Sequence, residues 1–169
     1  MDRFMLHRIH ALSAEMVAGY ESYNMVGVSQ ALSSFVTQYL NSFSFEIYKD
    51  RLYLDEKNSS SRRSAQTVMH YALKALATYI APIACHLAEE LHSFQDNVDP
   101  AVSSADSVMK QGWFPTPNEW KQPALAEKWE TIRDVRRQVF RAIEDAKQGG
   151  IVTGMADAAI IIRAPPATK

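Results

Sequence analysis

The chain has 169 residues, of which 47% are hydrophobic and 22% are charged, and its formal net charge is -1. These values are ordinary for one globular domain with a substantial core, and they exclude a protein that wraps nucleic acid through a global basic field. Cys85 is the single cysteine, which excludes an internal disulfide and a thiolate cluster for zinc. No apolar run reaches the roughly 20 residues that cross a bilayer, so we expect a soluble protein.

The first predicted element is an amphipathic helix over residues 2–20. Its apolar side chains recur at alternating spacings of four and three, at Met5, Ile9, Leu12, Met16 and Gly19. Asp2 is the predicted N-cap. His7 and His10 lie in this helix without a spaced acidic or thiol partner, so we interpret them as structural or surface residues.

Two further helices are predicted on either side of a polar turn. Ser29 can cap a helix whose apolar stripe runs from Leu32 to Ile47. The segment 55–60 has no apolar residue, which indicates a turn at the surface. Ser60 or Ser61 can then cap a helix that Pro82 should end or kink.

Four cations flank this polar turn: Lys49, Arg51, Arg62 and Arg63. Arg and Lys at such a junction can contact phosphates, while Tyr48 or Tyr53 can stack on an unpaired base. The structural alternative is that Asp50 pairs with Lys49 or Arg51 and that the cluster is a solvated loop. The charge pattern alone favours this alternative, because charge runs at helix ends are common.

Residues 86–92 and 95–123 carry weaker signals. The first segment lacks both the H-E-x-x-H order and its inverse, so a short structural helix is favoured over a metal site, with Glu89 or Glu90 paired to a neighbouring cation. The second segment contains Trp113, Phe114 and Trp120, which favours a strap packed across the bundle. An aromatic platform for bases is the alternative.

The helical pattern returns at residues 125–146 and ends at Gly149-Gly150. One broad side of this helix carries Arg133, Arg136, Arg137 and Arg141. These arginines form either a solvated face or a phosphate track beside Arg62 and Arg63. Residues 151–152 and 158–162 are apolar and β-forming, which indicates the start of another domain.

The wording of the junction resembles a known family. Residues 49–53 read KDRLY and residues 62–67 read RRSAQT. This pair resembles the anticodon-binding helical domain of isoleucyl-tRNA synthetases, which are class I aminoacyl-tRNA synthetases. Residues 2–8, 81–83, 87–90 and 107–113 agree with the same family in the same order, so the similarity spans nearly the whole chain.

The resemblance implies an all-α, antiparallel helical bundle of four main helices over residues 1–149, with the 95–123 strap packed on it. Residues 150–169 would begin a truncated α/β junction domain. The parent enzyme joins isoleucine to its tRNA using ATP with magnesium. The His-x-Gly-His and Lys-Met-Ser-Lys-Ser signatures of its catalytic domain do not occur here, so we expect this chain alone to be inactive, without a cofactor or metal of its own.

The resemblance also predicts a partner, the anticodon arm of isoleucine tRNA, with the rest of the synthetase in cis. The predicted contacts are Lys49, Arg51, Arg62, Arg63, Arg133, Arg136 and Arg137, with Tyr48 or Tyr53 for stacking. Alternatives are the equivalent domain of a valyl- or leucyl-tRNA synthetase, and a helical protein-interaction module without RNA binding. The wording of residues 43–46 and 86–87 favours a mitochondrial over a cytoplasmic enzyme.

Overall fold

The computed structural model describes residues 1–95 and 107–163. The chain divides into two compact units, Met1–Pro123 and Ala124–Lys169, which are described separately below. This division falls inside the range predicted as one bundle, and the predicted domain limit at residue 149 stays a prediction. Residues 96–106 of the predicted strap lie outside the described residues.

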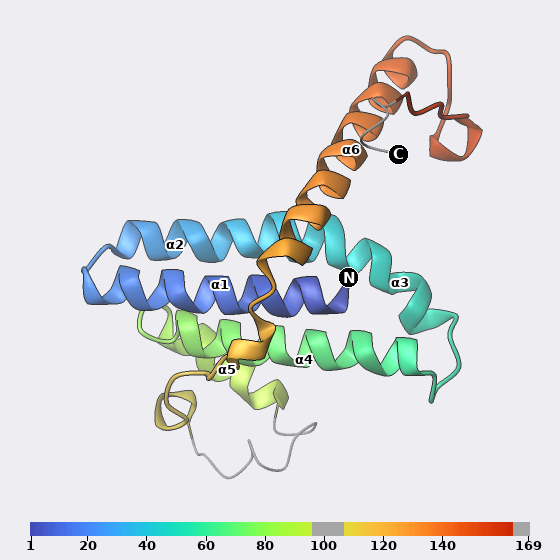
Figure 1. Ribbon diagram of the computed structural model, residues 1–169. Helices are drawn as coiled ribbons and strands as arrows, with labels where there is room; N and C mark the ends of the chain where they lie inside the picture. The colour runs from blue at the N-terminus through green and yellow to red at the C-terminus, as the bar shows by residue number, and fades with distance from the viewer. Residues whose placement is uncertain (96–106, 164–169) are drawn as a thin grey trace. The chain divides into compact units, whose positions relative to one another are not determined.

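Helices α1 (Asp2–Glu21) and α2 (Met25–Ser34) form a hairpin, shown in blue in Figure 1. Two predicted caps are wrong. The residue before α1 is Met1, and no side chain caps that helix. Asn24 rather than Ser29 caps α2, because its side chain accepts a hydrogen bond of 3.0 Å from the Gly27 amide.

The apolar stripe of α2 continues without a break through a π-helical segment, η1 (Phe35–Phe45), into α3 (Glu46–Tyr53). The aromatic side chains of η1 pack on the first turn of α1. The Phe4 ring lies 6.2 Å from the rings of both Tyr39 and Phe43, and Phe35 stacks on Tyr39 at 6.1 Å. These contacts form the aromatic part of the core.

Helix α4 (Ser60–Ile80) completes the central layer, with α5 (Cys85–Gln95) packed beside it. Figure 1 shows α1 lying between α2 and α4. The buried face of α4 is rich in small side chains, which allow close helix packing: Ala65, Ala72, Ala75 and Ala77. Helix α4 ends at Ile80, two residues before Pro82, as the proline predicts. The predicted all-α class is confirmed.

Residues 107–122 pack across α1 and α4 and contain two short 3-10 turns, η2 (Val108–Lys110) and η3 (Asn118–Trp120). Trp113 stacks on Tyr79 at 4.7 Å and donates from Nε1 to Ser13 Oγ at 3.3 Å. Trp120 is 9% exposed and lies 5.2 Å from the Tyr71 ring. These contacts pack the rings against α1 and α4; Trp120 is buried, whereas Trp113 keeps 38% of its surface exposed.

Glu89 on α5 has a different partner from the predicted cation. Its carboxylate accepts hydrogen bonds from Ser107 Oγ at 2.5 Å and from the Val108 amide at 3.3 Å. The hydrogen bond from Ser107 contributes most to lowering the pKa of Glu89 below its ordinary value. Glu89 therefore anchors the start of η2 to α5.

Two α1 histidines hold the other end of this segment. His7 Nδ1 accepts a hydrogen bond from the Gln122 amide at 3.1 Å, and His10 Nδ1 lies 3.1 Å from Thr116 Oγ1. Burial, followed by the charge of Arg8, lowers the pKa of His7 below its ordinary value of 6.5. Nδ1 accepts the hydrogen bond from the Gln122 amide, so this contact needs that nitrogen unprotonated.

The pKa of His7 predicts a pH dependence of stability. Because its folded pKa is lowered, the unfolded chain binds the proton first, and the stabilisation is lost as pH falls below about 6.5. We expect the free energy of unfolding, measured by urea titration between pH 5 and 8, to rise with pH. His7→Gln should reduce that slope, whereas an unchanged slope in this variant would assign the pH dependence to other groups.

The Ala124–Lys169 unit consists mainly of α6 (Pro123–Gln148). Ile143 is the buried residue of this helix. Residues 151–163 are irregular apart from a 3-10 turn, η4 (Met155–Asp157), and the described part of the chain contains no strand. The predicted β-forming character is not realised there, since a strand needs a neighbouring strand for its backbone hydrogen bonds. Among the described helices, none has the length and apolar content to cross a membrane.

Candidate nucleic-acid interface

The predicted site lies where α3 passes through residues 54–59 into α4. Ser59, rather than Ser60 or Ser61, caps α4 by accepting a hydrogen bond of 3.1 Å from the Arg62 amide. Ser59 Oγ also donates to Asp55 Oδ2 at 3.4 Å, which ties the cap to the loop. The cap therefore fixes where the first turn of α4, with its two arginines, begins.

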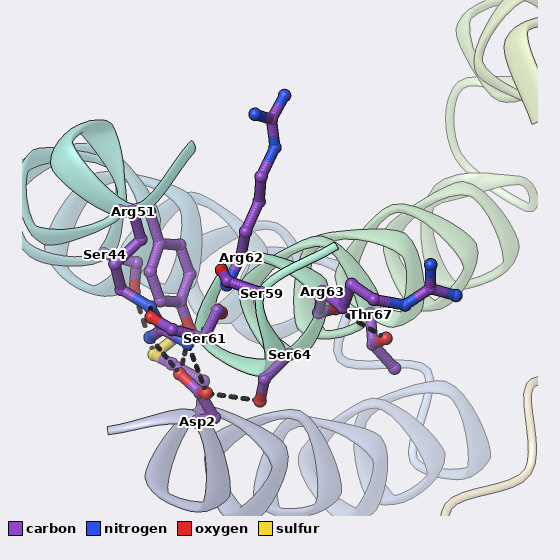
Figure 2. A network of polar contacts seen from close by, with 11 residues as sticks. Asp2, Ser44, Arg51, Ser59, Ser61, Arg62, Arg63, Ser64 and Thr67 are labelled. Atoms are coloured by element: carbon purple, nitrogen blue, oxygen red, sulfur yellow. Dashed lines mark hydrogen bonds and ion pairs between the residues drawn. The ribbon is translucent and has the colours of Figure 1, made fainter. Parts of the chain in front are cut away.

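A network of polar contacts joins this turn to α1 and α3, as Figure 2 shows. Arg51 forms a bidentate ion pair with Asp2, with Nη1–Oδ1 and Nη2–Oδ2 distances of 2.7 and 2.8 Å. Arg51 also donates to Ser61 Oγ at 2.9 Å and to the Ser61 carbonyl oxygen at 2.5 Å. Ser64 donates to the second carboxylate oxygen of Asp2. We call these four residues the Asp2 network: Asp2, Arg51, Ser61 and Ser64.

The Asp2 network holds its carboxylate in the ionised form. Burial opposes ionisation, but hydrogen bonds from Arg51 and Ser64 and the charge of Arg51 outweigh it and lower the pKa of Asp2 to about 2. The side chains of Arg51 and Asp2 are only 20% and 22% exposed. The expected pairing of Asp50 with Arg51 is wrong, because the carboxylate that meets Arg51 comes from α1. Arg51 thus holds three helices together.

The two tyrosines predicted for base stacking differ in exposure. Tyr48 is 1% exposed, and its hydroxyl donates to Asp2 Oδ1 at 3.3 Å. Burial raises the pKa of Tyr48 above its ordinary value. The prediction that Tyr48 stacks on a base is wrong for this structure, because the ring lies inside the core. Tyr53 is 80% exposed at the end of α3 and is accessible to a ligand.

The other three cations of the junction lie on its surface. Arg62 donates from Nη1 to the Asp55 carbonyl oxygen at 3.3 Å and is half-buried. Arg63 is exposed, and Figure 2 shows its guanidinium pointing away from the Asp2 network. Lys49 is exposed and pairs with Glu46 at 2.7 Å, one helical turn away. An exposed pair of this kind is weak and can exchange Glu46 for a phosphate.

The arginines of α6 belong to the other unit, and acidic neighbours already pair with two of them. Arg133 is bound by Glu130 at 2.7 Å and is 15% exposed, and Arg137 is paired with Asp134 and is 74% exposed. The Arg136 guanidinium lies over the Phe140 ring at 4.3 Å, and Arg141 is exposed. Whether these arginines and those of α4 form one track stays a prediction.

Cations thus gather where two helices of this all-α fold meet, an arrangement that can contact a polyanion. The sequence profile of the family described as "Anticodon-binding domain of tRNA ligase" matches residues 2–162. The chain belongs to this family.

Individual relatives narrow the comparison. The chain is 34% identical over 165 residues to the isoleucine–tRNA ligase of Crocosphaera subtropica, an alignment that covers 98% of this chain and 17% of the relative. Against the enzymes of Gloeothece citriformis and a Synechococcus strain, the identities are 36% and 37%, over 96% and 88% of this chain and 16% and 15% of the relatives. The chain thus spans about a sixth of the length of these ligases.

Sequence reasoning missed the contribution of Asp2, Ser61 and Ser64 to this site. Asp2 meets Arg51 and Ser64 across 49 and 62 positions, and Ser61 meets Arg51 across 10 positions, so no helical spacing reveals these contacts. The only structural role that the sequence predicted for Asp2 was the N-cap of the first helix. Arg51 follows Tyr48 by three residues and so lies on the same side of α3. The burial of Tyr48, which would call for a carboxylate partner beside Arg51, is known only from the structure.

Proposed function

We propose that this chain is the part of an isoleucine–tRNA ligase that holds the anticodon arm of isoleucine tRNA. The membership of the anticodon-binding family supports the class of ligand, and the identity to isoleucine–tRNA ligases over nearly the whole chain supports the choice of tRNA. The observation that carries the proposal is the pair of adjacent arginines at the first turn of α4, of which Arg63 is exposed, together with the exposed Tyr53 at the end of α3.

In this proposal, Arg63, Lys49 and the outer part of Arg62 contact phosphates, and Tyr53 stacks on an unpaired base. Arg137 and Arg141, together with Arg136, are further candidate phosphate contacts on α6. Arg133 is a weaker candidate because Glu130 already pairs with its half-buried guanidinium. Arg51 is removed from the direct contacts, since it is engaged by Asp2 and Ser61.

The activity of the parent protein is part of the same proposal. A catalytic domain outside this chain would join isoleucine to the tRNA with ATP and magnesium. Residues 150–169 would begin the α/β junction domain that follows the helical bundle. We also keep the mitochondrial matrix as the proposed location. Isoleucine-dependent exchange between ATP and pyrophosphate should be at background for this chain alone, because the catalytic signatures are absent from its sequence.

The RNA contact is tested by Arg63→Ala. Binding of an isoleucine tRNA transcript should weaken by about 3- to 10-fold, since one phosphate contact is lost. The slope of log affinity against log salt should flatten by about 0.7–0.9. Lys110→Ala is the matched control: it removes one exposed cation from η2, beside the end of α4 near Ala77 and Ala81, and should change little.

Fluorescence anisotropy across a salt titration gives both readouts, and circular dichroism checks that the helices remain. Arg63→Lys should bind within about twofold of the parent chain, because a phosphate contact needs the charge more than the shape of the group. If Arg63→Ala and Lys110→Ala weaken tRNA binding equally, the loss of affinity comes from the change in net charge, which would contradict a local site at Arg63. Parent-like binding by Arg63→Ala would exclude Arg63 as a contact.

A further inference from the structure

We propose that Asp2 and Arg51 are positioning residues for RNA binding: they hold the first turn of α4 so that Arg62 and Arg63 are ordered before the RNA arrives. This inference rests on the proposed function. It assigns a role to two residues that do not themselves touch the RNA. It also explains how the KDRLY and RRSAQT segments are connected in the structure. Arg51 belongs to KDRLY and donates to the carbonyl oxygen of Ser61, the residue before RRSAQT.

The geometry of the turn carries the argument. Arg62 and Arg63 lie between Ser61 and Ser64, and both serines are bound by the Asp2 network. Arg51 donates to the carbonyl oxygen of Ser61, which belongs to the peptide group that joins Ser61 to Arg62. A backbone carbonyl before the two arginines and a side-chain hydroxyl after them are therefore held from outside the helix, in a region where helix ends ordinarily fray.

The contacts also explain why this task suits an arginine on α3. The bidentate pair with Asp2 fixes the plane of the guanidinium, and the remaining donors of the same group reach Ser61. A lysine at position 51 would keep the charge but could not make this set of planar contacts. The positions of α1, α3 and the first turn of α4 are thus linked through one side chain, as Figure 2 shows.

Order of this kind raises affinity by reducing the conformational entropy that is lost on binding. Ordering the long side chain of a surface arginine lowers affinity, and a frayed turn adds the backbone cost of its residues. Removing the Asp2 network should therefore weaken RNA binding without removing a phosphate contact. The slope of affinity against salt distinguishes these two effects, because it reports the number of neutralised phosphates.

The experiment compares Asp2→Asn, Arg51→Lys and Asp2→Glu with the parent chain in binding an isoleucine tRNA transcript. Asp2→Asn and Arg51→Lys should each weaken binding by about 3- to 10-fold, within the range expected for one or two disordered side chains, while the salt slope stays that of the parent. Asp2→Glu, which can still pair with Arg51, should retain more affinity than Asp2→Asn. Arg51→Lys should therefore weaken binding, whereas Arg63→Lys should bind the RNA nearly as well as the parent chain.

Double variants exclude general destabilisation as the cause. In the Asp2→Asn background, Arg63→Ala should weaken binding less than it does in the parent, because Arg63 is already disordered there. Arg137→Ala, which removes a cation from the other unit, should have the same effect in both backgrounds. Measurements well below the melting temperature of each variant, with helix content monitored by circular dichroism, keep all chains folded.

The outcomes separate the inference from the function on which it rests. If Arg63→Ala weakens binding equally in both backgrounds, the contact stands and the positioning role is overturned. If Asp2→Asn strengthens binding and steepens the salt slope, the released Arg51 acts as a phosphate contact, which also overturns the positioning role. If Arg63→Ala has no effect in the parent chain, the RNA contact and the positioning role fail together.

Discussion

Replacing Trp120 with alanine is expected to destabilise the Met1–Pro123 unit by about 3–5 kcal/mol, the range for removing a buried tryptophan. Trp120 is 9% exposed and lies against the Tyr71 ring at 5.2 Å and the Phe114 ring at 6.3 Å. Alanine would leave a cavity between α4 and the segment that crosses it. The neighbouring hydrogen bond between the Gln122 amide and His7 should weaken at the same time.

Urea unfolding followed by circular dichroism measures this effect, which corresponds to a melting temperature lower by on the order of 10 °C. Trp120→Phe should lose less stability than Trp120→Ala, because an aromatic ring still meets Tyr71. Tyr53→Ala is the matched control, since it removes an aromatic side chain that is 80% exposed and should cost under about 0.5 kcal/mol. Similar costs for Trp120→Ala and Tyr53→Ala would show that Trp120 does not anchor the segment.

The helices could be predicted from the sequence because the apolar stripes repeat with the period of a helix. Their starting residues were less certain, because several side chains near each start can cap it. Asn24 caps α2 in place of Ser29, and Ser59 caps α4 in place of Ser60 or Ser61. A cap depends on the backbone angles of one residue, which a hydrophobic pattern does not specify.

The site was predicted only in outline. Tyr48 and Tyr53 are five positions apart, so on a helix they point about 140° away from each other. The two rings therefore cannot both face the solvent side of an amphipathic helix. Helical spacing identifies that contrast, but knowing which tyrosine is buried requires the neighbouring helices. The partner of Arg51 lies 49 positions away, and such a pairing follows from the packing of α1 against the junction. The sequence shows where the cations are, but it does not show that Arg51 is paired inside the junction whereas Arg63 is exposed.

Asp2→Asn should destabilise the folded chain at neutral pH by about 1–2 kcal/mol, and this difference should shrink in acid. The folded pKa of Asp2 is lowered from 3.8 to about 2, because Arg51 and Ser64 outweigh the opposing effect of burial. Each pKa unit corresponds to about 1.4 kcal/mol, and we reduce the total because the carboxylate is partly exposed and screened. The stabilisation is present above pH 3.8 and is lost as pH falls toward 2, since the unfolded chain is protonated first.

Urea unfolding of the parent chain and of Asp2→Asn at intervals from pH 7 down to pH 2.5 tests this prediction. Protonated aspartic acid and asparagine are both neutral, so the difference between the two free energies of unfolding should shrink steadily below pH 3.8 as the pH approaches the folded pKa of about 2. Asp50→Asn, which removes an exposed carboxylate from α3, controls for the loss of one negative charge and should not show this decrease. A difference between parent and Asp2→Asn that stays constant with pH would mean that Asp2 acts through its shape and hydrogen bonds, and that its ion pair with Arg51 contributes nothing to stability.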